Sequence, residues 1–401
     1  MCGRQRLKTG LVGLLAAAAA MSLSLRAEDA AVADERASGA LQRGSQATRL
    51  AVLPALDLAN GKADTLVVDA LLERRLGGIG FDVLAADEVL AFLRRHRMRY
   101  TGGMTHARLS EMRAELSVEA VFVVSIDSFE VEGPPRVALN ARIVSTESGN
   151  ILWAGEVAAA GEEHPGVLGL RTVDDVEALL EGAVERLLAP LRKGGLITDA
   201  GAVEREPVWK HRPGRKGHRP KKVFRAPELD EFRERPPRVA VLPMENNSNN
   251  ADAGGILAGL FATHLAGRGE VTIIEPGEVR RTLLRGRVIQ QQGLSLPQAD
   301  FLREMADVDL AVSGRLMEFQ DFGAGTVPRV VFSVWIIDVR RRSVVWSGYS
   351  ANLGDDGVVF FRHGHVATAR ALASSMVEAA VTSIVNGMPS LAKVGRDSGT
   401  R

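Results

Sequence analysis

The chain has 401 residues, of which 46% are hydrophobic and 25% are charged, so its composition is that of a globular protein too long for one typical domain. Its 50 basic and 49 acidic residues give a net charge of +1, which excludes a global attraction to nucleic acid or to an acidic substrate. We therefore expect two domains and no nucleic-acid partner. Any electrostatic function must come from a local cluster of charges.

The N-terminus has the pattern of a secretory signal peptide. A basic start is followed by an apolar run over residues 11–25 and then by small residues. The run is shorter than the roughly 20 residues that a membrane-spanning helix needs. We predict a leader over residues 1–33, cleaved after Ala27 or Ala33, and an exported, periplasmic protein.

The chain has a single cysteine, Cys2, and it lies inside the predicted leader. A bacterial lipoprotein needs a cysteine directly after its apolar run, and none stands there, so a lipid anchor is not expected. The mature chain would also hold no disulfide. The sequence thus predicts a periplasmic protein, at most peripheral to the outer membrane.

An internal repeat is the main signal for domain organisation. Residues 49–54 (RLAVLP) return as residues 238–243 (RVAVLP), and residues 151–155 (ILWAG) return as residues 344–348 (VVWSG). Collinear landmarks at nearly constant spacing indicate duplication. The predicted organisation is a first domain over 48–191, a basic linker rich in Pro and Gly over 192–236, a second domain over 237–388 and a disordered tail over 389–401.

The elements expected in the first copy follow from their caps and periodicity. They are a buried strand over 50–53 stopped by Pro54, a helix from about Asp64 to Leu76 ended by left-handed glycines at 77 and 78, a strand over 81–84, a helix from Asp87 to Arg95, a helix begun at Thr105 and a strand over 120–126. Ser295 is expected to begin the matching helix of the second copy, with Gln298 completing a capping box.

The next strand alternates apolar and other residues in both copies, so one of its faces should lie in the core. The apolar positions are Val137, Leu139, Ala141 and Ile143 in one copy and Val330, Phe332, Val334 and Ile336 in the other. A strand with tryptophan and a long amphipathic helix complete each copy. The expected order is β-α-β-α-α-β-β-β-α, an α/β (α+β) fold in which helices pack on a mixed sheet.

Several motifs of the second copy resemble one family of proteins. Residues 239–243 (VAVLP) with an Asn-rich loop at 245–250, residues 308–314 (VDLAVSG) and residues 344–348 (VVWSG) look like the CsgG-like, LpoB-like and TolB N-terminal-domain-like bacterial envelope superfamily. The resemblance implies two tandem anticodon-binding-domain-like domains that act through protein contacts, without catalytic residues or cofactors. The chain departs from that pattern because it lacks the lipidated cysteine, the membrane-spanning hairpins of CsgG and the propeller of TolB.

The search for chemistry finds no constellation of catalytic residues, and we predict no enzyme, no cofactor and no metal. The glycine run at 254–259 lacks the lysine of a phosphate-binding loop, so a helix entry loop is expected there. His363 and His365 could share a metal ion but lack a recognisable third ligand, so a solvated loop is favoured. Asp307 and Asp309 are expected to be solvated rather than a catalytic pair.

The linker is the candidate for anion contact because it carries many basic residues and no acidic one between Lys210 and Arg225. These residues are Lys210, Arg212, Arg215, Lys216, Arg219, Lys221, Lys222 and Arg225. Prolines and glycines favour an extended chain without regular structure. We expect either a solvated spacer or a tether that binds an anionic membrane surface or lipopolysaccharide.

The reverse face of the alternating strand is the candidate partner surface. In the first copy it carries Ala138, Asn140, Arg142 and Val144, a half-solvated pattern; in the second it carries Val331, Ser333, Trp335 and Ile337. The apolar version predicts burial against the terminal helix, the other domain or a separate protein, with Val331, Trp335 and Ile337 as contacts.

The leading functional hypothesis is a non-enzymatic envelope protein that binds or scaffolds other envelope proteins. The alternatives are an accessory component of an outer-membrane secretion or transport assembly and, more weakly, an unrecognised hydrolase. The sequence leaves self-association open.

Overall fold

The computed structural model describes residues 47–162, 173–194, 218–232, 235–287, 294, 296–321, 327–356, 365–386 and 388. We call residues 48–191 the first half and residues 218–388 the second half, and both belong to one compact unit, Thr48–Arg401. The predicted leader, including Cys2, and the predicted tail lie outside the described residues.

The first half is a six-stranded mixed sheet with helices on both faces. Its strand order is β3-β1-β4-β5-β6, with β2 paired to β4; β1, β3 and β4 are parallel, and β4, β5 and β6 form an antiparallel meander. The elements are β1 (Arg49–Val52), β2 (Leu56–Asp57), α2 (Thr65–Gly78), β3 (Asp82–Val83), α3 (Ala86–Arg95), α4 (His106–Leu116), β4 (Ala120–Glu130), β5 (Arg136–Ser145), β6 (Ile151–Ala160) and α5 (Val176–Gly194).

The second half has the same strand order in a seven-stranded sheet, β10-β8-β11-β12-β13-β7, with β9 paired to β11. Its elements are β7 (Lys222–Arg225), the 3-10 helix η3 (Pro227–Glu231), β8 (Arg238–Val241), β9 (Glu245–Asn246), α7 (Ala253–Ala266), β10 (Thr272–Ile273), α8 (Pro276–Arg285), α9 (Leu296–Ala306), β11 (Leu310–Gln320), β12 (Arg329–Asp338), β13 (Ser343–Leu353) and α10 (Ala369–Val385). The predicted α/β class is therefore confirmed.

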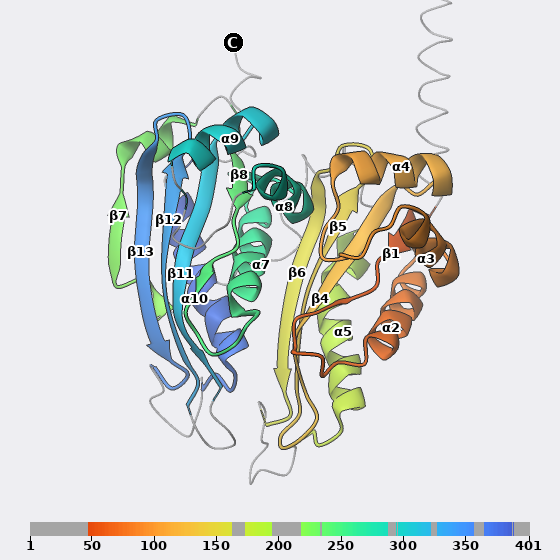
Figure 1. Cartoon of the computed structure of the whole chain (residues 1–401). Coiled ribbons are helices and arrows are strands. Elements are labelled where there is room, and N and C mark those ends of the chain that lie inside the picture. Colours follow the sequence, from red (N-terminus) through yellow and green to blue (C-terminus); the bar gives the residue numbers. More distant parts are fainter. Residues whose placement is uncertain are drawn as a thin grey trace, which may run out of the picture. The chain divides into compact units, whose positions relative to one another are not determined.

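Each sheet has an inner face that carries the main core. The four apolar positions of β5 and the four of β12 are all buried, as the alternation predicted. In the first half they pack with α2 and α5, and in the second half with α7 and α10 (Figure 1). Smaller cores lie on the other face, under α3 and α4 in the first half and under α8 and α9 in the second.

The helix ends predicted from capping residues and glycines were confirmed for some helices and wrong for others. The Asp64 carboxylate accepts the N–H groups of Leu66 and Val67 and begins α2, and Thr105 caps α4 through the N–H of Arg108. The glycines at 77 and 78, expected as left-handed caps, are instead the last helical residues; the left-handed residue is Gly80, with φ +105°. Helix α3 begins one residue before Asp87, after Ala85, and Ala85 provides no side-chain cap. Ser295 lies outside the described residues.

Within the described part of the chain, no helix is long and apolar enough to cross a membrane.

A partly buried acid in α2 gives the fold a pH dependence. Asp69 accepts the backbone N–H of Ala55 at 2.9 Å, and burial, opposed by that hydrogen bond and assisted by the nearby Glu73 carboxylate, raises the pKa of Asp69 to about 6. Since the carboxyl group binds its proton more tightly in the folded state than in the unfolded state, stability is lost as pH rises from about 4 to about 6.

We expect Asp69→Asn, which keeps an oxygen acceptor for Ala55, to raise the free energy of unfolding by about 1–2 kcal/mol at pH 7.5 and by nearly nothing at pH 4. Because Asp69 is partly exposed, this gain is smaller than the free energy that corresponds to the full pKa shift. Urea denaturation at both pH values measures it. The exposed Asp87→Asn is the matched control, and an equal gain at pH 4 and pH 7.5 would contradict the assignment to Asp69.

Candidate functional site

The outer face of the first sheet is covered by the second half. Helices α7 and α10 pack against β6, and α7 also packs against β5. Small residues on α7, including Gly259 beside Asn140, let the helix approach an alanine-rich sheet face closely. Ala138 and Asn140 are therefore buried, and Val144 is buried in the small core under α3 and α4, so the expected half-solvated pattern of this face is wrong. Periodicity identified the face correctly but not what covers it.

An ionic network lies inside this contact between the halves. Arg370 of α10 is 1% exposed and donates to Asp127 of β4 at 2.7 Å and to Glu156 of β6 at 3.0 Å. Ser374, one turn further along α10, donates to Glu156 at 2.6 Å. A shift in the β4–β5 register, between Ile126 and Ser128, places Asp127 in a bulge, a device that redirects a side chain.

Burial and pairing act in opposite directions on these carboxyl groups. Burial raises the pKa of Asp127 despite the neighbouring Arg370 guanidinium and the Ser125 hydroxyl. For Glu156, burial also acts to raise the pKa, but Arg370 and His264 outweigh it and lower the pKa. Two carboxylates therefore share one buried guanidinium, and each depends on Arg370 for its charge.

A second ion pair joins the halves near the start of α8. Arg142 of β5 contacts Glu275 at 2.6 Å and donates to the backbone oxygen of Gly102 at 2.8 Å, and its side chain is 12% exposed. Glu275 is the N-cap residue of α8 and also accepts the N–H of Gly277. The polar residues of the first sheet's outer face are thus contacts between the halves.

Serine, histidine and glutamate meet in this contact without forming a catalytic triad. The His264 Nε2 atom lies 3.1 Å from Ser374 Oγ and 4.0 Å from Glu156. A triad needs the serine on one imidazole nitrogen and the acid on the other. Here the same nitrogen faces both groups, and the serine proton is donated to the carboxylate, so the arrangement does not activate the hydroxyl.

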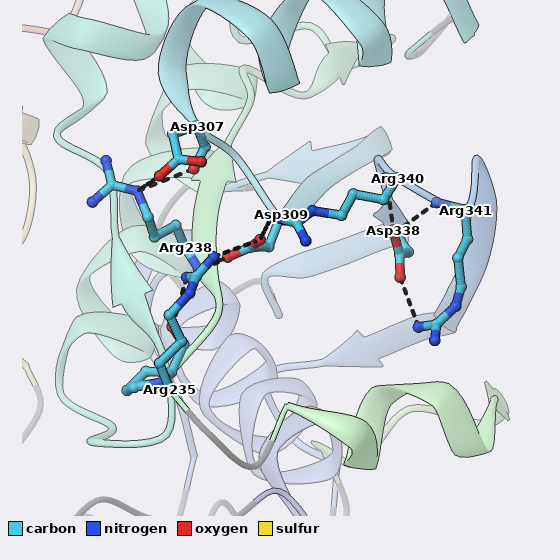
Figure 2. Close-up of polar contacts among 8 residues, drawn as sticks. Arg235, Arg238, Asp307, Asp309, Asp338, Arg340 and Arg341 are labelled. Carbon is cyan, nitrogen blue, oxygen red and sulfur yellow. Dashed lines mark hydrogen bonds and ion pairs between the residues drawn. The ribbon is translucent and has the colours of Figure 1, made fainter.

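Asp307 and Asp309 take part in an arginine cluster at the entry of β11 (Figure 2). Asp309 is 3% exposed and accepts from both terminal nitrogens of Arg235, at 2.7 and 3.0 Å, and from the backbone N–H of Arg238 at 2.9 Å. Arg340 lies 3.4 Å away. Asp307 is 76% exposed and faces Arg238. The expectation of a solvated side chain is confirmed for Asp307 and wrong for Asp309.

The neighbouring Asp338 completes the cluster by holding the β12–β13 turn. Its carboxylate accepts the N–H groups of Arg340 and Arg341, both at 2.9 Å, and pairs with the Arg341 guanidinium at 3.1 Å (Figure 2). Each acid of the cluster is thus matched by arginine or backbone donors. The cluster ties the chain before β8 to β11 and β12, a structural role.

The basic linker is only partly described, because Lys210, Arg212, Arg215 and Lys216 lie outside the described residues. The expectation of no regular structure is wrong for Lys222 and Arg225. They are the first and last residues of strand β7, which pairs antiparallel with β13. Arg225 contacts Asp230 at 2.5 Å and the backbone oxygen of Asn386 at 2.7 Å. The remaining two, Arg219 and Lys221, precede this strand. The structure leaves an anion-binding role of the linker as a prediction.

The remaining candidate motifs are the glycine run and the two histidines. The glycine run at 254–259 forms the first turns of α7, so the expected entry loop is wrong. His363 is outside the described residues and His365 precedes α10. Among the described residues, no group of three or more His, Cys, Asp or Glu side chains could hold a metal ion.

The outer face of the second sheet is less covered than that of the first. We call the side chains of Phe224, Trp335, Val344, Tyr349 and Leu353 the outer apolar face. Cross-strand pairing places Trp335 beside Ser347 and Ser347 beside Phe224, which is 52% exposed. Trp335 is partly buried, whereas Val331 and Ile337 are buried. Helix α10 packs on the opposite face, so it does not cover Trp335.

Sequence reasoning missed Arg370, Asp127 and Glu156. Each is a charged residue in a mostly apolar helix or strand, and a charge that is buried with such an element needs a partner. That signal was readable, but the identity of the partner was not. Phe224 was missed because its strand is short and was assigned to the linker.

The fold and these contacts define a mixed α/β protein whose two halves are joined by a buried ionic contact. No protein-family model and no curated protein matches the chain. Solved structures similar to part of it include the PelC dodecamer of Paraburkholderia phytofirmans (21% identity, TM-score 0.29, covering 41% of this chain and 94% of that one). Another is lipoprotein GNA1162 of Neisseria meningitidis (22% identity, TM-score 0.26, covering 35% of this chain and 96% of that one). A third is the LpoB C-terminal domain of Salmonella enterica (20% identity, TM-score 0.25, covering 30% of this chain and 90% of that one). These likenesses are too distant to assign a partner or an activity.

Proposed function

We propose that the chain is a non-enzymatic binding protein of the bacterial cell envelope that holds a protein partner on the outer apolar face of the second sheet. The observation that carries the proposal is the difference between the two sheets. The outer face of the first sheet is covered by α3, α4, α7 and α10, whereas the outer apolar face keeps Phe224, Val344 and Leu353 exposed. The predicted leader supports an envelope location.

The occupant that fits this face is an apolar helix of a different protein. On the first sheet the corresponding face accepts α7, a helix rich in small and apolar residues. Helices α2 and α5 of a second copy of the chain cannot pack on this face, because they carry exposed ion pairs on their surface. Arg74 contacts Glu181 at 3.3 Å and Arg75 contacts Glu185 at 3.1 Å. Burying these charges would cost more than the contact returns.

The test is a quantitative binding assay with a partner recovered from envelope fractions by crosslinking. We expect Trp335→Arg to weaken binding at least thirtyfold, because a central aromatic contact contributes about 2 kcal/mol or more and arginine would place a charge in the interface. Phe224→Arg should act in the same direction.

Leu66→Arg is the matched control, since Leu66 is an exposed apolar residue on α2 of the first half. It should bind like the unaltered protein. Circular dichroism and thermal melting must show that all variants fold. A folded Trp335→Arg protein that retains its partner would exclude this face.

A further inference from the structure

A cleft of about 410 Å³ lies where α8 of the second half meets the segment before α4 of the first half. Five of its twelve lining residues are arginines and none is acidic. We call it the arginine cleft, and its arginines are Arg99, Arg108, Arg280, Arg281 and Arg285. Because the whole chain has nearly equal numbers of basic and acidic residues, this excess of positive charge is local.

Backbone segments of both halves line the cleft at Gly103 and Gly277. Gly103 and Gly277 bring their backbones so close that a Cβ atom on Gly103 would lie 2.7 Å from the backbone nitrogen of Gly277, and one on Gly277 would collide with the backbone of Met104. The adjacent Arg142–Glu275 ion pair holds the same place together. The position of α8 against the first half is therefore fixed, and so is the spacing of the arginines.

Most of the positive charge in the cleft is not neutralised by the described residues. Arg108 contacts Glu111 at 2.5 Å. Within the described part of the chain, no carboxylate lies within 4 Å of the other four guanidinium groups. Two further acids of this region have other partners, because Glu275 pairs with Arg142 and Glu278 accepts the N–H of His106 at 3.1 Å. Arg281 and Arg285 stand one turn apart on α8, where like charges repel.

One side of the cleft is ordered by an aromatic contact. The Arg280 guanidinium stacks on the Tyr100 ring at 4.2 Å from its centroid. Burial raises the pKa of Tyr100, although Arg142 and Arg280 act to lower it, so the hydroxyl remains a donor at neutral pH. An anion in the cleft would therefore meet guanidinium groups, one of which is held in place by the Tyr100 ring.

The fold itself does not require Arg280 and Arg281. Glu88 and Val89 of α3 correspond to Glu278 and Val279 of α8 in the sequence repeat, and the next two positions are Leu90 and Ala91 in α3 but Arg280 and Arg281 in α8. Arg280 and Arg281 thus occur on α8, the helix that lies beside the first half at the cleft.

We infer that the arginine cleft binds a multiply charged phosphate anion of the pyrophosphate type, held by Arg99, Arg281 and Arg285. A single carboxylate carries too little charge for several unpaired guanidinium groups, whereas phosphate oxygens match the planar guanidinium fork from several directions. The volume suits a diphosphate with a small organic group. The same chemistry occurs in a soluble diphosphate and in the phosphomonoester headgroup of phosphatidic acid, both of which can carry more than one negative charge.

The test uses the full chain and two probes. Isothermal titration calorimetry with inorganic pyrophosphate at low ionic strength measures soluble binding. Sedimentation with vesicles that contain phosphatidic acid, against phosphatidylcholine vesicles, measures headgroup binding. We expect Arg99→Gln, Arg281→Gln and Arg285→Gln each to weaken binding about tenfold or more. Arg186→Gln removes an exposed arginine from α5, outside the cleft, and should change binding less than twofold.

Loss of pyrophosphate binding in the three cleft variants supports a soluble diphosphate, and loss of vesicle binding alone supports a lipid headgroup. Binding of neither probe by the unaltered protein overturns the inference, as does an equal loss in Arg186→Gln. Thermal melting with and without pyrophosphate confirms that each variant is folded, because a bound ligand raises the melting temperature. Trp335→Arg should keep full anion binding, so failure of the partner surface and failure of the cleft are distinguishable.

Discussion

Replacing Arg370 by alanine should lower the free energy of unfolding by about 3–5 kcal/mol at pH 8, because it leaves the Asp127 and Glu156 carboxylates buried without their cation. Both contacts are shorter than 3.1 Å, and Asp127 is as fully buried as Arg370 itself. Removing one partner of such a network costs more than the network contributes, since the remaining charges cannot return to water. Urea denaturation measures the difference.

Arg303→Ala is the matched control for Arg370→Ala. Arg303 is an exposed arginine of α9 that pairs with Asp300 at 3.9 Å and Glu304 at 3.4 Å. Exposed pairs of this kind contribute below about 1 kcal/mol. If the two variants lose similar stability, the buried network does not hold the halves together as inferred.

The loss caused by Arg370→Ala should also depend on pH. Arg370 acts to lower the pKa of Asp127 and of Glu156, so both pKa values rise when it is removed. A carboxyl group whose folded pKa lies above its unfolded value contributes its full stability at low pH and loses it as pH rises. The difference between the variant and the unaltered protein should therefore shrink from pH 8 to pH 5. A constant difference would show that lost packing, rather than uncompensated charge, dominates.

The inner faces of both sheets could be predicted because the signal is local. Apolar residues at every second position of β5 and β12 can only face a core, and apolar residues at helical spacing on α5 and α10 face the same cores. Proline after β1 and the aspartate cap of α2 likewise act within a few residues of themselves.

The outer faces could not be predicted, because what covers them comes from distant parts of the chain. Arg370 and Asp127 are 243 residues apart, and a bulge sets the direction of Asp127. Asn140 looked solvated because it is polar, yet it accepts from the Thr263 hydroxyl of α7 at 2.9 Å. Strand β7 is four residues long, too short for its periodicity to be read, and the unpaired edge of β13 decides where it lies.

The arginine cluster at β11 gives the second large effect. We expect Asp309→Ala to lower the free energy of unfolding by about 2–3 kcal/mol, because it removes the acceptor of the Arg238 N–H group and of both Arg235 nitrogens. The expected loss is smaller than for Arg370→Ala for a physical reason. The guanidinium groups of Arg235 and Arg340 are half exposed, so water can solvate them once Asp309 is gone.

Two further variants separate charge from hydrogen bonding at this cluster. Asp309→Asn keeps one oxygen acceptor but loses the bidentate pairing, so about 1–2 kcal/mol should be lost. Asp307→Ala removes the exposed neighbour and should cost below about 1 kcal/mol. Urea denaturation of the three variants under one condition gives the order Asp309→Ala, then Asp309→Asn, then Asp307→Ala. A loss from Asp307→Ala as large as that from Asp309→Ala would show that the exposed acid, and not the buried one, anchors the arginines to β11.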